Sequence, residues 1–415
     1  MRDDMRDDVR TLRELASTYH NLALNSDQSE KIKLHTAVNN LKPIRPVVLI
    51  DELPWNEMNL DDELTMVCAD PVLRTAEWYL RSNIYKYRHM PADMILQSFV
   101  PVNKVVLSSG IGLEIDERIL STDQKNHIVS HQYRDILSTE EDLEKLHNPV
   151  LTYDQDETLR RYHLLGEILG DILPVKLTGV GACYVTTWDQ IAVYRGVTDL
   201  LMDLADRPEF MHKLVRKLTD ISLSQLRQHE DLGLFDNAPG SLHCTPTLVS
   251  DLPGPDYDGQ KLTRKNIWGR GAAQIFASVS KDMHEEFDIN YMKETIGQCG
   301  LAYYGCCEPL DRKIDIVEKI PNLRKISVTP WADPDRAADA IGRKYVFSSK
   351  PTPAAVAVSV LDEAALRLEI GRILAAVRRN DCSCDIVLKD ISTCNRRPEN
   401  IFRWQQIVME MVQSL

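Results

Sequence analysis

The sequence predicts an α/β protein, a (β/α)8 TIM barrel with an N-terminal helical extension. From about residue 100, short apolar runs rich in β-branched residues alternate with loops containing Gly, Asp or Pro and then with amphipathic helices. The alternation continues over roughly 300 residues, which favours a barrel, although an open doubly wound sheet gives a similar pattern.

Residues 1–90 form the predicted extension and residues 91–415 the barrel. Apolar residues at three-to-four spacing predict helices over 9–41. The apolar run 46–51 predicts an early extended segment, and an Asp-Pro pair begins a helix over 70–85.

The predicted strands of the barrel are apolar runs bounded by turn residues: 104–107, 175–178, 301–307, 325–328, 345–348 and 386–388. The predicted helices lie between them: 157–173, 188–203, 208–229, 281–297, 310–320, 334–341, 362–379 and 398–413. Carboxylate caps and prolines signal several starts, as in Asp333-Pro334. A complete G-x-G-x-x-G fingerprint is missing, because Tyr184 follows Gly179 and Gly181 where a third glycine is needed.

Composition and charge exclude several classes of function. The formal net charge of -13 repels phosphate backbones, and no basic patch opposes it, so nucleic-acid binding is not expected. No apolar run approaches the ~20 residues of a membrane span. The first ten residues alternate Arg and Asp without an apolar core, which predicts a cytoplasmic protein without a secretory signal. Its nine cysteines are then expected to be reduced.

The segment Tyr303-Tyr304-Gly305-Cys306-Cys307-Glu308-Pro309 is the densest in chemistry, since two thiols and a carboxylate follow a strand. Barrels place their chemistry at the carboxyl ends of their strands. Alternation along an extended backbone favours Cys307 over Cys306 as the residue that faces the site. Packing of two small cysteines between strand and helix is the alternative.

Cys394 lies in the loop after the last predicted strand, at the same end of a barrel as Cys307. Two thiolates and a carboxylate suit zinc, which is usually bound by three protein ligands in catalytic sites. Cys307, Glu308 and Cys394 are therefore the predicted ligands, with Cys306 as a further candidate, and Glu308 is also the predicted catalytic carboxylate.

Three other residues are candidates for lining the same site. His243 lies in a turn-rich loop beside Cys244, and Trp331 and Lys350 follow predicted strands. The alternatives are that the His243 imidazole is merely solvated, that Trp331 packs at the rim of the barrel, and that the Lys350 amine is solvated. Cys382 and Cys384 precede the last strand, which predicts structural thiols at the opposite end.

Four segments of the chain resemble the uroporphyrinogen decarboxylase superfamily, in the same order: 199–210, Tyr304-Gly305-Cys306-Cys307-Glu308-Pro309-Leu310, 326–331 and 398–400. The likeness runs from about residue 90 to the end and is stronger to the corrinoid-dependent methyltransferases than to the decarboxylases. Those relatives bind zinc with a His-x-Cys pair and a later Cys. On this chain the two cysteines fall on Cys307 and Cys394, and the histidine falls on Gly305, so Glu308, Cys306 or His243 must replace it.

The resemblance implies a zinc-dependent methyltransferase that moves a methyl group between a small methylated substrate, such as a methyl ether, and a corrinoid on a partner protein. It does not determine the direction of transfer. It also does not decide between a monomer and a homodimer. The rivals are a metal-free decarboxylase of the same superfamily and a barrel that only binds a small ligand. The arginine motif with which the decarboxylases hold a porphyrinogen is missing near the N terminus.

Overall fold

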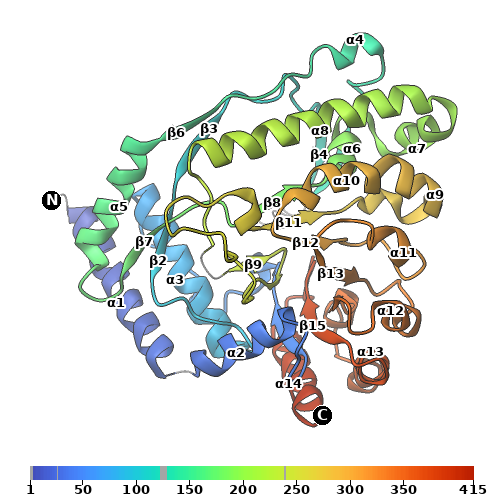
Figure 1. The fold of residues 1–415 in the computed structure, drawn as a ribbon. Helices are drawn as coiled ribbons and strands as arrows, with labels where there is room; N and C mark the ends of the chain where they lie inside the picture. The colour runs from blue at the N-terminus through green and yellow to red at the C-terminus, as the bar shows by residue number, and fades with distance from the viewer. Residues whose placement is uncertain (1–2, 26, 122–128, 238–239) are drawn as a thin grey trace.

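The computed structural model describes residues 3–25, 27–121, 129–237 and 240–415. Its centre is a parallel seven-stranded sheet with the order β1-β15-β14-β13-β12-β11-β8 (Figure 1). The strands are β1 Val47–Ile50, β8 Ala182–Val185, β11 Trp268–Gly271, β12 Leu301–Tyr304, β13 Leu323–Val328, β14 Val346–Ser349 and β15 Ser383–Leu388. The α/β class is confirmed. Among the described residues, no strand pairing joins β1 to β2 and closes the sheet.

Four pairs of short strands complete the β structure. They are β2 Val100–Asn103 with β7 Val175–Thr178, β3 Val105–Ser108 with β6 Leu151–Asp154, β4 Glu117–Leu120 with β5 Ser130–Tyr133, and β9 Ser241–Leu242 with β10 Thr245–Pro246. Only β2 and β7 pair in parallel. The predicted strand 104–107 is largely confirmed as β3, but it pairs antiparallel with β6 and is not part of the central parallel sheet. The parallel strand is the apolar run just before it.

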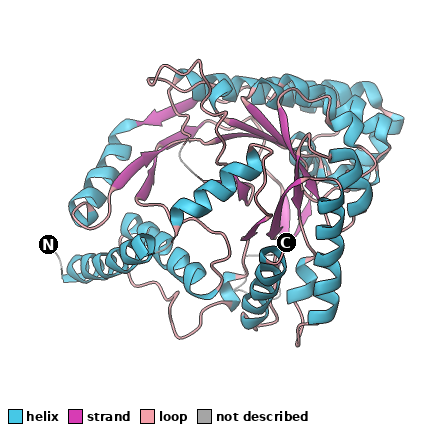
Figure 2. Cartoon of the chain, turned by 60° about the horizontal axis from the view of Figure 1, so that its bottom comes forward, coloured by secondary structure: helices cyan, strands magenta, loops and turns pink. Residues whose placement is uncertain are grey.

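Helices surround the sheet on its outer side (Figure 2). They are α1 Asp3–Asn25, α2 Gln28–Asn39, α3 Pro71–His89, α4 Glu140–Leu143, α5 Gln155–Leu169, α6 Thr187–Arg195, α7 Val197–Asp206, α8 Pro208–Asp231, α9 Lys281–His284, α10 Asn290–Glu294, α11 Ile314–Val317, α12 Pro334–Ile341, α13 Glu363–Arg379 and α14 Glu399–Gln413. The predicted cap of α12 is confirmed, because the Asp333 carboxylate accepts the N–H groups of Asp335 and Arg336. No described helix combines the length and the apolar character needed to cross a bilayer.

The predicted extension is not separate from the sheet. Its helix α1 packs on α3 and α5, and Leu12 and Tyr19 are fully buried there. However, β1 also lies within residues 1–90, and its Val47 pairs with Asp385 of β15. A strand within residues 1–90 therefore forms one edge of the central sheet, and the boundary at residue 90 stays a prediction.

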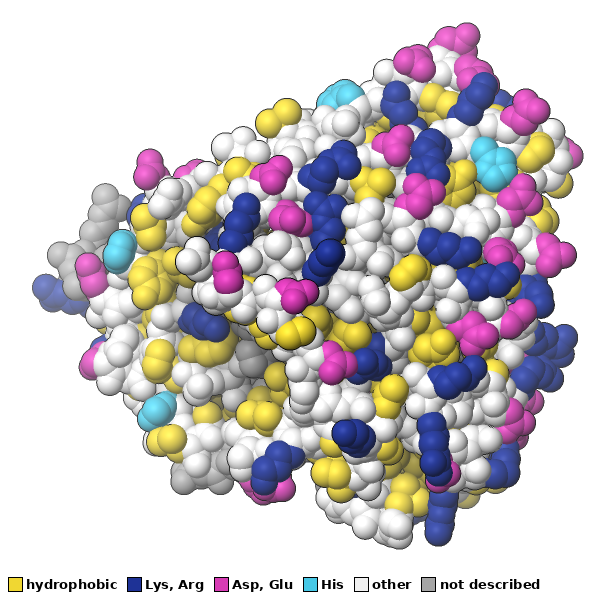
Figure 3. Space-filling model, in the orientation of Figure 1, with side chains coloured by type: hydrophobic (Ala, Val, Ile, Leu, Met, Phe, Trp, Pro, Cys, Tyr) yellow, Lys and Arg dark blue, Asp and Glu magenta, His cyan; other side chains and the backbone are white. Residues whose placement is uncertain are grey.

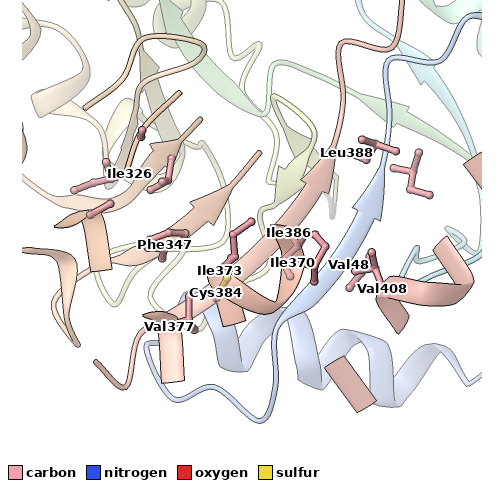
Figure 4. Packing of buried hydrophobic residues seen from close by; sticks show 14 of the residues in the cluster. Val48, Ile326, Phe347, Ile370, Ile373, Val377, Cys384, Ile386, Leu388 and Val408 are labelled. Carbon is pink, nitrogen blue, oxygen red and sulfur yellow. The ribbon is translucent and has the colours of Figure 1, made fainter. Parts of the chain in front are cut away.

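The two faces of the sheet differ in polarity. Ile326, Phe347 and Ile386 belong to successive strands and share one apolar cluster with Ile370 of α13 and Val408 of α14; Ile370 lies near Ile386 and Val408 near Val48 (Figure 4). Because side chains alternate along a strand, the residues between them point to the opposite face. That inner face carries polar side chains, including Lys325, Ser348 and Asp385, all of them buried.

A buried ionic network joins β13, β14 and β15 on this inner face. The Lys325 ammonium donates to Asp385 Oδ2 at 2.8 Å, and the Ser348 hydroxyl donates to Asp385 Oδ1. Lys350 Nζ donates to Ser348 Oγ at 2.7 Å and lies 3.9 Å from Asp385 Oδ1. Burial opposes ionisation of Asp385, but the two ammonium groups outweigh it and hold the pKa of that carboxyl below its usual range.

A hydrogen-bonded chain of buried groups lies on the helix side of β12. Tyr304 Oη donates to Asp288 Oδ2 at 2.5 Å, and His284 Nε2 lies 2.6 Å from Tyr304 Oη. Lys313 Nζ lies 3.3 Å from His284 Nδ1. Because an ammonium can only donate, His284 accepts at Nδ1 and donates from Nε2. Burial lowers the pKa of His284 to about 3 and raises the pKa of Asp288 to about 8, so both groups are neutral near pH 7.

The raised pKa of Asp288 predicts a pH-dependent stability. The folded chain keeps a proton that the unfolded chain releases near pH 4, so the stabilisation is full below about pH 4 and is lost as the pH rises toward 8. We expect urea unfolding between roughly pH 5 and 7 to give a free energy that falls by up to about 1.4 kcal/mol per pH unit from this group. Asp288→Asn, which still accepts from Tyr304, should remove that part of the slope. An unchanged slope would contradict the assignment.

Candidate metal centre at the carboxyl edge of the sheet

Loops from three strands meet at the carboxyl edge of the parallel sheet. Glu52 follows β1, Cys306 and Cys307 follow β12, and Lys389 and Asp390 follow β15. Since all three strands run in the same direction, their carboxyl ends lie on one side. This is the edge at which parallel α/β proteins bind ligands.

The β9–β10 hairpin brings His243 and Cys244 to the same edge. Both residues have positive φ, 45° and 67°, as a two-residue hairpin turn requires. Asn and Gly suit this conformation, whereas a histidine and a cysteine adopt it with strain, which is typical of functional positions. The turn is fixed where Lys325 donates to Pro246 O at 3.0 Å and Tyr184 Oη accepts the His243 N–H at 3.1 Å.

We call Glu52, His243, Cys244, Cys306 and Cys307 the edge cluster. His243 Nε2 lies 2.9 Å from Cys306 Sγ, and Cys306 Sγ lies 3.6 Å from Cys307 Sγ. On the other side of the imidazole, His243 Nδ1 lies 4.0 Å from Glu52 Oε1. Ligand atoms of Glu52, His243 and Cys244 all lie within 4.8 Å of one another, so these three residues could hold a metal ion.

Charges around the edge cluster favour a thiolate at Cys306. The Cys307 thiol and His243 lower the pKa of Cys306, while the negative Cys306 raises the pKa of Cys307. Cys307 then stays protonated, and its thiol donates to Asp390 Oδ2 at 3.6 Å. Lys389 Nζ donates to Glu52 Oε2 at 3.1 Å and to Asp390 Oδ2 at 2.6 Å, which fixes the two carboxylates.

The preference for Cys307 over Cys306 stays a prediction, and Cys306 is the thiol that contacts His243. The alternation on which that preference rests stops early. The strand β12 ends at Tyr304, and Gly305 has a φ of +99°, which side chains other than glycine rarely adopt. The backbone therefore turns before the two cysteines.

Glu308 is not placed with the thiols as a ligand. Its side chain is fully buried, with Oε2 accepting the Cys306 N–H at 2.9 Å and Oε1 accepting the Ala273 N–H at 3.1 Å. Burial raises its pKa to about 7. Glu308 thus fixes the backbone at Cys306, and its role as ligand and catalytic carboxylate stays a prediction.

Cys394 also lies apart from the edge cluster. Its thiol donates to Glu57 Oε2 at 3.4 Å, and its N–H donates to the same oxygen at 2.9 Å. Cys394 is fully buried, and burial together with Glu57 raises the pKa of its thiol. Among the described residues, Cys307, Glu308 and Cys394 do not form a group with ligand atoms within 4.8 Å. The predicted three-residue set is therefore not assembled.

The other predicted site residues lie in different surroundings. Trp331 is 70% exposed after β13, whereas Lys350 is buried inside the sheet and donates to Ser348. Cys382 contacts Ala338 O, and Cys384 packs in the outer apolar core, which agrees with structural thiols.

Sequence reasoning missed Glu52 as a ligand candidate, and it named Cys244 only as the neighbour of His243 in the turn-rich loop. The signal for Glu52 was present, because a carboxylate directly after an apolar run obeys the same rule that singled out Cys307. The hairpin that carries Cys244 is two residues per strand, too short to show a pattern.

Acidic and basic side chains are interspersed over the face shown in Figure 3, so this face presents no large region of a single charge. Comparison with protein-family models and with curated proteins gives no match to this chain. The likeness to the uroporphyrinogen decarboxylase superfamily therefore rests on the four sequence motifs alone. The possible chemistry of the site follows from the residues of the edge cluster.

Proposed function

We propose that this chain is a zinc-dependent methyltransferase of the uroporphyrinogen decarboxylase superfamily. It would move a methyl group between a small methylated substrate and a corrinoid carried by a partner protein. The observation that carries the proposal is the contact of His243 with Cys306 beside two further thiols at the carboxyl edge of the sheet. One imidazole and two thiols are donors that zinc prefers, and they match the donor types of the methyltransferases that the sequence resembles.

The proposed fold is a closed barrel. The order of the central sheet continues through β7, which precedes β8 by three residues, to its parallel partner β2. If β7 and β8 are counted as one bent strand, β2 to β15 follow in sequential order, and β1 comes next. The Asp93 N–H donates to Val48 O at 3.0 Å, which brings the segment before β2 against β1. A pairing of β1 with β2 would close the ring.

The edge cluster fits a catalytic zinc in its chemistry. His243 and Cys306 would supply two ligands, and the third would come from Cys244, which lies beside His243, or from Cys307, which lies beside Cys306. Three protein ligands leave one position for substrate. A bound zinc supplies Lewis acidity toward the heteroatom that carries the methyl group, or holds an acceptor thiol as its thiolate.

The other residues of the site would hold charge and protons in place. Asp390 Oδ2 accepts the Cys307 proton, and Lys389 balances the negative charge of Glu52 and Asp390. Glu308 fixes the Cys306 N–H and so the direction of the thiolate. These contacts support a site in which Cys306 is favoured as a thiolate, while the Cys307 thiol keeps its proton and donates to Asp390.

Methyl transfer can be tested with the purified full chain, zinc, free reduced cobalamin and a panel of methanol, a methylamine and a methoxybenzoate. We expect formation of methylcobalamin, and a rate at least ~10²-fold lower for His243→Ala, because the imidazole links both parts of the edge cluster. His163→Ala is the matched control, since His163 is exposed on α5. The reverse reaction uses methylcobalamin and a thiol acceptor.

Equal rates in wild type and His243→Ala, or no methyl transfer in either direction, would contradict the proposal. A decarboxylation that survives both metal removal and Cys307→Ser would instead support the metal-free rival of the same superfamily.

A further inference from the structure

Arg270 is a buried cation for which the described residues provide no hydrogen-bond acceptor. Its side chain is 4% exposed on β11, and its Nε and Nη2 are buried without a hydrogen-bond partner among the described residues. Other buried cations in this chain are paired, such as Arg195 with Asp203 and Lys325 with Asp385. An unpaired charge in a protein interior is costly. The Asp189 carboxylate interacts electrostatically with Arg270, but it accepts its hydrogen bonds from Gln274. Nε and Nη2 of Arg270 are therefore left without an acceptor among the described residues.

The direction of Arg270 follows from the two glycines beside it. A Cβ on Gly269 would lie 2.9 Å from Cys299 Sγ, and a Cβ on Gly271 would lie 2.7 Å from Met292 Sδ. Both glycines thus face the helices, which approach the sheet closely. Arg270, between them, points to the inner face, where the ionic network of Lys325 and Asp385 also lies.

Two tyrosines flank Arg270 on this inner face. Strand register pairs Arg270 with Tyr184 of β8 and with Tyr303 of β12. The guanidinium carbon lies 6.0 Å from the centre of the Tyr184 ring, and Lys350 Nζ lies 5.9 Å from the centre of the Tyr303 ring. Two cations and two aromatic rings therefore lie close together on the inner face.

The same tyrosine connects Arg270 to the edge cluster. Tyr184 Oη accepts the His243 N–H, and His243 contacts Cys306. Where β11 and β12 end, the Gly305 N–H donates to Gly271 O at 2.8 Å, so the residues after Arg270 lie directly beside the thiol loop. Tyr184 and Trp268 also line a cavity of about 410 Å³, although Arg270 and the residues of the edge cluster are not part of its lining. This volume is within the range of small-molecule sites.

We propose that Arg270 binds the carboxylate of the methyl-bearing substrate, so that the substrate is a small methylated organic acid. The planar guanidinium fork suits a carboxylate, which accepts two parallel N–H bonds. The inference rests on the proposed function, because it places the acid group of the substrate in the interior and its methyl group toward the edge cluster.

Calorimetric titration of the full chain tests this site without zinc and without methyl transfer. The probes are two matched pairs, 4-methoxybenzoate with 4-methoxybenzamide and methoxyacetate with methoxyacetamide, together with inorganic phosphate. We expect at least one acid to bind about 10-fold or more tightly than its amide. Arg270→Met should abolish that difference, whereas Arg118→Met, at an exposed arginine of β4, should keep it.

Thermal unfolding of the ligand-free protein gives a second readout. If Arg270 is unpaired in the ligand-free protein and pairs only with a bound anion, Arg270→Met removes an unpaired buried charge. This variant should then have a higher midpoint temperature of thermal unfolding. A lower midpoint would assign Arg270 to structure and overturn the proposal. It is also overturned if neither acid binds more tightly than its amide, if phosphate alone binds, or if Arg270→Met keeps the preference. If Arg270 does not bind a carboxylate, the protein can still transfer methyl groups from neutral donors, so the proposed function is not contradicted. If the protein transfers no methyl group, the titration still shows whether Arg270 binds a carboxylate.

Discussion

Asp385→Ala is expected to lower the free energy of unfolding by about 3–5 kcal/mol, because it leaves two buried ammonium groups without their carboxylate. Asp385 is fully buried, Lys325 is 1% exposed, and both Lys325 and Lys350 lie on the same inner face. Burial already lowers the pKa of each lysine, so neither keeps its charge easily without Asp385. Urea unfolding monitored by circular dichroism measures the change.

The surface pair of Arg343 and Asp381 provides the matched control. Its side chains are 78% and 62% exposed, and water and salt screen the attraction between such groups. Arg343→Ala removes the same pair and leaves Asp381, whose φ is positive, in place, so it should leave the urea midpoint almost unchanged. If Asp385→Ala shifts the midpoint no more than Arg343→Ala does, the ionic network does not stabilise the sheet as described.

Cys306→Ala is expected to reduce zinc affinity by at least ~10²-fold, while Cys394→Ala should leave it unchanged. Cys306 contacts His243, whereas the Cys394 thiol is bonded to Glu57 away from the edge cluster. The sequence resemblance assigns Cys394 as a ligand and so predicts the opposite result for this variant. Competition with a chelating dye, on variants first shown to be folded, measures both affinities.

Cys382→Ala is the control for loss of a buried thiol far from the edge cluster, since Cys382 contacts Ala338 O before the last strand. Zinc retained in Cys306→Ala but lost in Cys394→Ala would restore the ligand set implied by the resemblance. Zinc lost equally in all three variants would show that any buried cysteine change disturbs the fold.

Strands made of continuous apolar runs could be predicted from the sequence. Strands that contain or closely follow glycines, or that carry a buried charged residue, could not. The predicted runs at 175–178, 325–328 and 386–388 all lie within strands of the structure. The strand β11 reads Trp-Gly-Arg-Gly, which lacks any apolar pattern because its glycines admit the neighbouring helix and its arginine faces the interior. The strand β8 was overlooked for a similar reason, since it follows the broken glycine fingerprint.

Only part of the candidate site could be predicted, because long-range contacts decide the rest. The position of Cys306 and Cys307 after a strand was visible in the sequence, and so was the general neighbourhood of His243. Their contact depends on a hairpin turn with positive φ and on the turn at Gly305, neither of which a residue pattern reveals. The separation of Cys394 from the thiols depends on Glu57, which lies 337 residues away in the chain.

The most direct test of the metal centre is X-ray absorption spectroscopy at the zinc edge on the zinc-loaded full chain. The edge cluster predicts two sulfur ligands at about 2.3 Å and one imidazole nitrogen at about 2.0 Å, and His243→Ala should remove the imidazole signal. A first shell with two sulfurs and no imidazole would instead fit Cys307, Glu308 and Cys394. A shell without sulfur, or a protein that binds no zinc, would contradict the proposed function.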